Sequence, residues 1–125
     1  MEVTADDYLQ EADFILSEKR YKDAIAYYDK AITIQSDNPI IWLNRGIALR
    51  RLELYKDAIA SYEKALAIQP DYHQAWCDRG VALGYLRRHK EAFASFDKAV
   101  KIKPDDATAW LNRGLALQEL ERYDS

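Results

Sequence analysis

The feature that most constrains this chain is a repeat, because three tryptophans, Trp42, Trp76 and Trp110, recur 34 residues apart. The same interval separates Gly46, Gly80 and Gly114, and it also separates Pro70 from Pro104. A period shared by unrelated residue types indicates a chain built from repeated structural units. It divides the chain into repeats 5–38, 39–72 and 73–106 and a partial repeat 107–125, which together predict one domain over 1–125.

Each repeat is predicted to hold two helices. Apolar and small residues at helical spacing predict a first helix over 40–52 and a second over 55–68, and in the partial repeat a helix over 108–120. The pair Asn38-Pro39 favours a helix start, a part that Asp71 and Asp105-Asp106 are expected to play in later repeats. We expect the mid-helix glycines to let the second helix approach closely along its alanines, with Trp and Tyr rings filling the space between repeats.

The composition excludes several classes of protein. The 125-residue chain is 49% hydrophobic, with 18 Lys and Arg against 21 Asp and Glu. This balance leaves no positive excess for nucleic acid, and no apolar run approaches the roughly 20 residues that span a membrane. The acidic N-terminus lacks the apolar core of a secretory signal. A lone cysteine, Cys77, cannot form an internal disulfide, so we expect a cytoplasmic location.

The repeats resemble the tetratricopeptide repeat family. The residues that carry the resemblance are Trp42, Gly46, Leu49, Ala58, Tyr62, Ala65 and Pro70, matched one period later by Trp76, Gly80, Leu83, Ala92, Phe96, Ala99 and Pro104. The resemblance implies an all-α fold, a right-handed α-solenoid of antiparallel helix pairs with about seven helices. Regular repeats that contain Asn-Arg-Gly are similar to those of bacterial arrays, whereas helical repeats that read RNA have a different period.

Two sets of residues depart from the family pattern. Arg45, Arg79 and Arg113 precede the mid-helix glycines, where members often have Leu. We expect these arginines to be structural, with stems on apolar surface and guanidinium groups paired with carboxylates. The turn between helices often holds Gly in the family, and this chain has Lys19, Glu53, Arg87 and Glu121 there. A left-handed backbone at such a residue would cost roughly 1–2 kcal/mol.

The resemblance implies a concave groove lined by the first helices, which holds a peptide or a helix of a partner. The residues predicted to face it are Leu9, Asp13, Ile40, Leu43, Asn44, Ile47, Gln74, Cys77, Asp78, Val81, Tyr85, Thr108, Leu111, Asn112 and Leu115. This surface is largely apolar, and a contiguous apolar patch usually marks an interaction site. The alternative is that the chain itself covers the patch.

One subgroup of the family binds the carboxylate tails of chaperones with a set of Lys, Asn and Arg residues. The positions that match this set are Leu9, Asp13, Asn44, Gln74 and Asp78, or one repeat later Leu43, Ile47, Asp78, Thr108 and Asn112. Asp78 stands where the Arg is expected and would repel a carboxylate. A chaperone tail is therefore not the expected partner.

No motif predicts an enzyme, a metal or a cofactor. His73 and His89 stand isolated, without a metal-type pairing on one helix face. Cys77 has no arranged base, and Asp78 beside it disfavours a thiolate. Neither a Gly-rich phosphate loop nor a nucleophile motif is present in the sequence.

The last predicted helix carries Trp110, Gly114 and Leu117 on the face that in earlier repeats meets a second helix. Repeats stay soluble when the outermost face is polar, so this stripe predicts either a longer repeat array or a homodimer. The sequence as a whole predicts a non-enzymatic scaffold that binds a protein or peptide in an apolar groove. The alternative is a structural segment that assembles with copies of itself.

Overall fold

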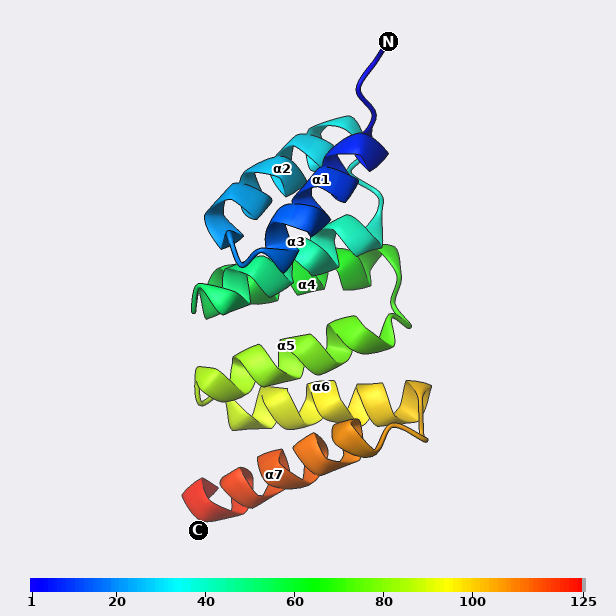
Figure 1. The fold of residues 1–125 in the computed structure, drawn as a ribbon. Coiled ribbons are helices and arrows are strands. Elements are labelled where there is room, and N and C mark those ends of the chain that lie inside the picture. Colours follow the sequence, from blue (N-terminus) through cyan, green and yellow to red (C-terminus); the bar gives the residue numbers. More distant parts are fainter. Residues whose placement is uncertain (125) are drawn as a thin grey trace. The chain divides into compact units, whose positions relative to one another are not determined.

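The computed structural model describes residues 1–124, and within this range it holds seven helices and no strand (Figure 1). The helices are α1 (Ala5–Ser17), α2 (Tyr21–Ile34), α3 (Pro39–Arg51), α4 (Tyr55–Ile68), α5 (His73–Tyr85), α6 (His89–Ile102) and α7 (Ala107–Asp124). The predicted all-α fold of antiparallel helix pairs is confirmed. None of the helices in the described range is long and apolar enough to cross a membrane.

The helices form two compact units, the first over Met1–Pro70 and the second from Asp71 onward. In the first unit α1 packs against α2, α2 against α3, and α3 against α4. In the second unit α5 packs against α6 and α6 against α7, with a smaller contact between α5 and α7. Each unit therefore repeats one arrangement, in which a second helix lies between two first helices.

The first helix of each repeat begins 34 residues after the one before it, even where the residue at the cap position is not a typical cap. The Asn38 side chain accepts a hydrogen bond from the Ile40 amide at 3.0 Å, and Asp106 accepts from the Thr108 amide at 3.0 Å, as predicted. The prediction that Asp71 caps α5 is wrong. The residue that precedes α5 is Tyr72, whose side chain makes no capping hydrogen bond. Asp71 lies one residue too early for the cap position that Asn38 and Asp106 occupy.

Three of the four turn residues hold the left-handed backbone that the sequence raised as a possibility. The φ angles of Lys19, Glu53 and Arg87 are 62°, 62° and 61°. Each ends a first helix and reverses the chain into the second helix of the same repeat. The fourth position is different, because Glu121 lies inside α7, which runs to Asp124. The prediction that this helix ends at 120 is wrong.

The helix pairs interlock through a glycine and an aromatic ring. A β-carbon added to Gly80 would lie 2.7 Å from the Phe96 ring, and Phe96 is buried. The close approach that the sequence predicted is therefore present, and an aromatic ring of the second helix lies beside the glycine. The burial of such a ring is worth about 1.5–3 kcal/mol, which exceeds the roughly 1 kcal/mol cost of a glycine inside a helix.

The tryptophans hold the loops that precede their helices. The Trp42 indole donates a hydrogen bond to the Ser36 carbonyl at 2.9 Å, and the Trp110 indole donates to the Pro104 carbonyl at 2.8 Å. The prediction that the Trp rings fill the space between repeats does not hold for Trp110, which is 46% exposed. Their shared role is to fix the connection between one repeat and the next.

Candidate functional site

In the first unit, the predicted groove residues lie on α1 and α3 with unequal exposure. Ile40 and Asp13 are exposed, whereas Leu9 and Ile47 are half-buried. Leu43 is only 2% exposed. The prediction that Leu43 lies open to a partner is therefore wrong, because its side chain is already removed from water and belongs to the core.

Two of the predicted polar residues of this unit bind each other. Asp13 Oδ1 accepts a hydrogen bond from the Tyr28 hydroxyl at 2.6 Å and another from Asn44 Nδ2 at 3.1 Å. Burial, together with the Asp13 carboxylate, raises the pKa of Tyr28 above its ordinary value, so this hydroxyl keeps its proton. The pair Asp13 and Asn44 thus joins α1 to α3 and presents a fixed polar edge beside Leu9 and Ile47.

In the second unit, a pocket of about 390 Å³ lies between α5, the start of α7 and the loop before it. Its lining residues are His73, Gln74, Cys77, Asp78, Val81, Asp106, Thr108 and Asn112. The structure therefore brings together six residues of the groove predicted from the sequence, counting Cys77. The two residues that sequence reasoning missed, His73 and Asp106, come from the first turn of α5 and from the cap of α7.

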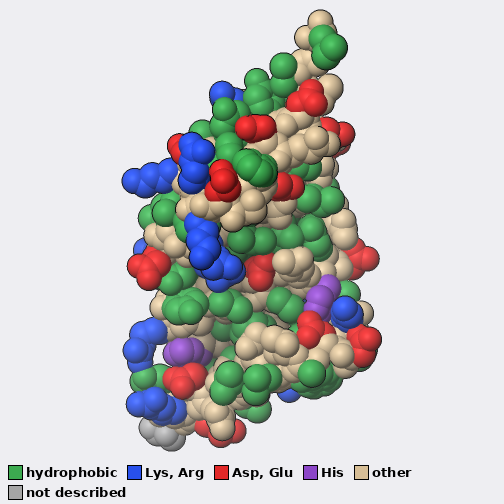
Figure 2. Space-filling view, in the orientation of Figure 1, with side chains coloured by type: hydrophobic (Ala, Val, Ile, Leu, Met, Phe, Trp, Pro, Cys, Tyr) green, Lys and Arg blue, Asp and Glu red, His purple; other side chains and the backbone are tan. Residues whose placement is uncertain are grey.

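Apolar side chains next to this pocket are open to solvent. Leu111 is 62% exposed and Leu115 is 50% exposed, both on α7, and Tyr85 at the end of α5 is also exposed. Figure 2 shows hydrophobic side chains over α7 on the face turned to the viewer. This part of the predicted groove is the most accessible apolar surface of the second unit.

The stripe predicted for self-association lies on α7 as well. Trp110 and Leu117 are exposed, and a β-carbon added to Gly114 would meet no atom within 4 Å. The equivalent glycines of α3 and α5 face a buried ring instead. In the second and third repeats an aromatic ring of the second helix packs against the glycine. Within the described residues no side chain occupies the equivalent position beside Gly114.

A cluster of three metal-binding side chain types forms one wall of the pocket. His73 Nε2 lies 2.7 Å from Asp106 Oδ2 and 3.6 Å from Cys77 Sγ, while His73 Nδ1 lies 3.1 Å from the Ala99 carbonyl oxygen. The expectation that His73 is isolated is wrong. The spacing of His73 and Cys77, four residues apart on one helix, is the sequence signal that could have revealed half of this cluster.

The Cys77 thiol is not activated in this setting. Burial raises its pKa to about 11, and the negative charges of Asp106 and Asp78 add to the effect, opposed by Lys103. A thiol with this pKa is protonated near neutral pH and is a poor nucleophile. His89, the other histidine, lies apart and stacks on the Tyr123 ring at 5.6 Å between ring centres.

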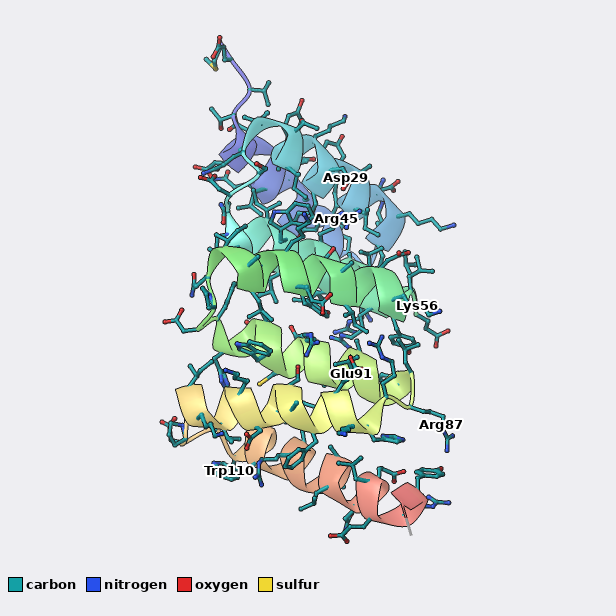
Figure 3. The ribbon with its side chains drawn as sticks, turned by 180° about the vertical axis from the view of Figure 1, so that it is seen from behind. Asp29, Arg45, Lys56, Arg87, Glu91 and Trp110 are labelled. Carbon is teal, nitrogen blue, oxygen red and sulfur yellow. The ribbon has the colours of Figure 1, made fainter. Side chains whose placement is uncertain are left out.

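The arginines before the glycines bond to neighbouring helices, which agrees with the structural role that the sequence favoured, and Arg45 joins three helices. Arg45 Nε donates to Asp29 Oδ1 on α2 at 2.7 Å, and Arg45 Nη1 donates to Ser61 Oγ on α4 at 2.7 Å. Figure 3 shows Arg45 and Asp29 facing each other between their helices. Arg113 donates in the same way to Asp97 at 3.0 Å in the second unit.

Comparisons with known proteins agree with this architecture. The chain matches the family described as tetratricopeptide repeat over residues 39–72 and as TPR repeat over residues 16–53 and 88–120. No curated protein sequence matches the chain.

Solved structures share the fold at low sequence identity. The TPR domain of OM64 from Arabidopsis is 26% identical, with 90% of this chain and 93% of that chain covered and a TM-score of 0.86. The first TPR domain of Spaghetti (RPAP3) bound to the HSP90 peptide SRMEEVD is 24% identical, with 94% of each chain covered and a TM-score of 0.92. The Sgt2 TPR domain from Aspergillus fumigatus is 23% identical, covers 96% and 81%, and has a TM-score of 0.89. With its repeat matches over more than half of its length, this chain belongs to the tetratricopeptide repeat family.

Proposed function

We propose that this protein is a non-enzymatic interaction scaffold that binds a peptide or helix of a partner protein along its first helices. The observation that carries the proposal is the pocket of about 390 Å³ between α5 and α7, flanked by exposed Leu111 and Leu115. Two further points support it. The chain belongs to a family whose members serve as such scaffolds, and its structural neighbours include TPR domains bound to HSP90 and HSP70 peptides.

The side chains around the pocket suit an extended segment with both apolar and polar contacts. Val81 and the exposed leucines of α7 offer apolar surface, and each leucine that becomes fully buried contributes about 1.5–3 kcal/mol before the cost of association. Gln74 and Asn112 carry amide groups that can donate to and accept from a peptide backbone. The leucines would supply most of the binding free energy, and the amide groups would fix the position of the peptide backbone along the site.

The charges at the pocket favour a neutral or basic partner segment over a carboxylate tail. The eight lining residues include Asp78 and Asp106 and neither a Lys nor an Arg. A carboxylate placed beside them would be repelled, whereas the family members that bind chaperone tails use basic residues at the matching positions. We therefore expect no binding of the peptide SRMEEVD, measured by the fluorescence anisotropy of a labelled copy, and a basic peptide of equal length serves as the comparison.

The proposal is tested by partner capture with charged substitutions in the groove. The double variant Leu111→Asp with Leu115→Asp, both on α7, should lose capture of proteins from the source cell while its helical circular dichroism is kept. Ile102→Asp is the matched control, because Ile102 is an exposed apolar residue on a second helix and should leave capture unchanged. Full capture by the double variant would contradict the assignment of the groove.

A second candidate function is self-association through α7, as in a structural or assembly segment. The exposed stripe of Trp110 and Leu117 and the open position at Gly114 favour it. If α7 covers another copy, light scattering should report a dimer at high concentration, and Trp110→Glu should return it to a monomer. A strict monomer for the unaltered protein would remove this candidate without affecting the first.

A further inference from the structure

The three side chains His73, Cys77 and Asp106 converge on one point, although Asp106 is 33 residues from His73. Their donor atoms, an imidazole nitrogen, a thiol sulfur and a carboxylate oxygen, all lie within 4.8 Å of one another. The side chains of His73 and Asp106 are 20% and 26% exposed, so the point is sheltered and still open to the pocket.

The proton on His73 can be placed from its hydrogen-bond partners. Nδ1 lies 3.1 Å from the Ala99 carbonyl, and a carbonyl only accepts, so Nδ1 carries a proton. In the neutral ring Nε2 then holds a lone pair, and it faces the Asp106 carboxylate at 2.7 Å. Nε2 is therefore the ring nitrogen that faces both the Asp106 carboxylate and the Cys77 sulfur.

The hydrogen bonds that His73 and Asp106 make away from the shared point are of the kind that orients metal ligands. A ligating histidine usually donates its other N–H to a carbonyl or carboxylate, as His73 does to Ala99. Asp106 Oδ1 accepts from the Thr108 and Ala109 amides at 3.0 and 3.3 Å, which fixes the carboxylate and leaves Oδ2 pointing at the histidine. Two of the three donors, those of His73 and Asp106, are thus held by the backbone of the second unit.

The separation of His73 Nε2 and Cys77 Sγ fits a tetrahedral ion. With metal–nitrogen and metal–sulfur bonds of about 2.0 and 2.3 Å, a tetrahedral angle separates the two donors by roughly 3.5 Å. The observed separation of His73 Nε2 and Cys77 Sγ is 3.6 Å. The corresponding nitrogen–oxygen separation is about 3.3 Å, so Asp106 Oδ2 would move back by about half an ångström from its present 2.7 Å.

A Cys-His-Asp relay would need the thiol and the carboxylate on opposite ring nitrogens. Here both face Nε2, while Nδ1 is held by a carbonyl. The arrangement of the three side chains around the imidazole therefore does not suit nucleophilic catalysis. Their donor atoms instead face one point, as the ligands of a single ion do.

We propose that His73, Cys77 and Asp106 bind a divalent ion of the zinc class, with a fourth position open to the pocket. The Cys77 thiol releases its proton to solvent as the metal–sulfur bond forms. The mixed nitrogen, sulfur and oxygen donors favour Zn²⁺ or Co²⁺ over Mg²⁺ and Ca²⁺, which prefer oxygen ligands alone. A water molecule or a side chain of a bound partner completes the tetrahedron. The site forms part of the wall of the pocket proposed for peptide binding. The two proposals can still be tested independently, because peptide binding can be measured in metal-free buffer.

Titration of the whole protein with Co²⁺ tests the site. We expect tetrahedral visible bands and a thiolate-to-cobalt charge-transfer band that saturate at one equivalent, and Zn²⁺ should bleach both. The charge-transfer band should vanish in Cys77→Ser, and binding should weaken about tenfold or more in His73→Gln and Asp106→Asn. His89→Gln is the matched control and should bind as the unaltered protein does.

Three results would overturn the proposal. They are the absence of a charge-transfer band at saturating Co²⁺, unchanged affinity in His73→Gln, and equal loss of affinity in His89→Gln, which would indicate surface binding. Circular dichroism of each variant separates loss of a ligand from loss of the fold. If Cys77→Ser does not fold, the band of the unaltered protein decides alone, because Cys77 is the only cysteine in the chain.

Discussion

Gly46 lies so close to Tyr62 that a β-carbon on the glycine would be 2.5 Å from Cε1 of the ring. Tyr62 is fully buried on α4, so the ring has little room to move. This contact, like that of Gly80 with Phe96, explains why a glycine, which costs about 1 kcal/mol inside a helix, stands at positions 46 and 80. Gly114 has no such neighbour within the described residues. This difference separates the glycines of this chain into two kinds.

The first prediction concerns those two kinds of glycine. Gly46→Ala should lower the free energy of unfolding by about 1–3 kcal/mol, because the methyl group overpacks against Tyr62. Gly114→Ala should raise it by about 1 kcal/mol, because nothing lies within 4 Å of the added carbon and alanine favours a helix. Urea denaturation measures both changes. Gly84→Ala is a matched control that should also stabilise, since that glycine faces open space too, and destabilisation by Gly114→Ala would mean that its face is covered in solution.

The second prediction concerns the left-handed turns. Glu53→Gly should stabilise the protein by about 1 kcal/mol, because Glu53 holds a φ of 62° that glycine adopts without strain. The gain is reduced by the greater entropy of glycine in the unfolded chain. Thermal unfolding followed by circular dichroism provides the measurement.

A matched control for this prediction is Glu121→Gly. Glu121 occupies the same place in the 34-residue period but lies within α7. The same substitution should therefore destabilise there by about 1 kcal/mol. Equal effects at the two positions would show that the turn conformation is not what distinguishes them.

The third prediction concerns the two bonds of Arg45. The bond to Ser61 is buried, since Ser61 is 1% exposed, whereas the carboxylate of Asp29 is largely in solvent. Arg45→Met should therefore cost about 1–3 kcal/mol, mostly through Ser61, and Asp29→Asn should cost less than about 1 kcal/mol. A double-mutant cycle with Arg45→Met and Ser61→Ala measures the coupling. Near-zero coupling, or a larger loss from Asp29→Asn, would reverse this ranking.

The fourth prediction concerns alkaline pH. Burial and the Asp13 carboxylate raise the pKa of Tyr28 in the folded state, so the folded protein holds this proton more tightly than the unfolded chain. The contribution to stability is complete below the unfolded value of 10.0 and is lost as pH rises above it. The urea midpoint should fall between about pH 9 and pH 11. In Tyr28→Phe the midpoint should start lower, through the lost hydrogen bond, and fall less steeply; parallel declines would contradict the assignment.

The sequence alone determined the repeat, the helix pairs and most of their bounds. Periodicity, prolines and turn residues act over a few residues, so α4 spans 55–68 as predicted and α3 is displaced by one residue. The groove was predictable in part for the same reason, because residues spaced along one helix share a face wherever that helix packs. Six of the predicted groove residues consequently meet in one pocket of the second unit.

Only the tertiary structure decided which side chains from different helices meet. Burial of Leu43 and the approach of Asp106 to His73 depend on how helices pack and how loops turn, which no local pattern encodes. The period gave one wrong prediction. Glu121 occupies the position of a turn residue in the period, yet it lies within α7. Within the described residues no second helix follows α7, so no packing stabilises a reversal of the chain there. The spacing of residues along the chain determines where each helix lies and which of its faces is apolar. Contacts between residues far apart in the sequence arise when the helices pack and those apolar faces are removed from water.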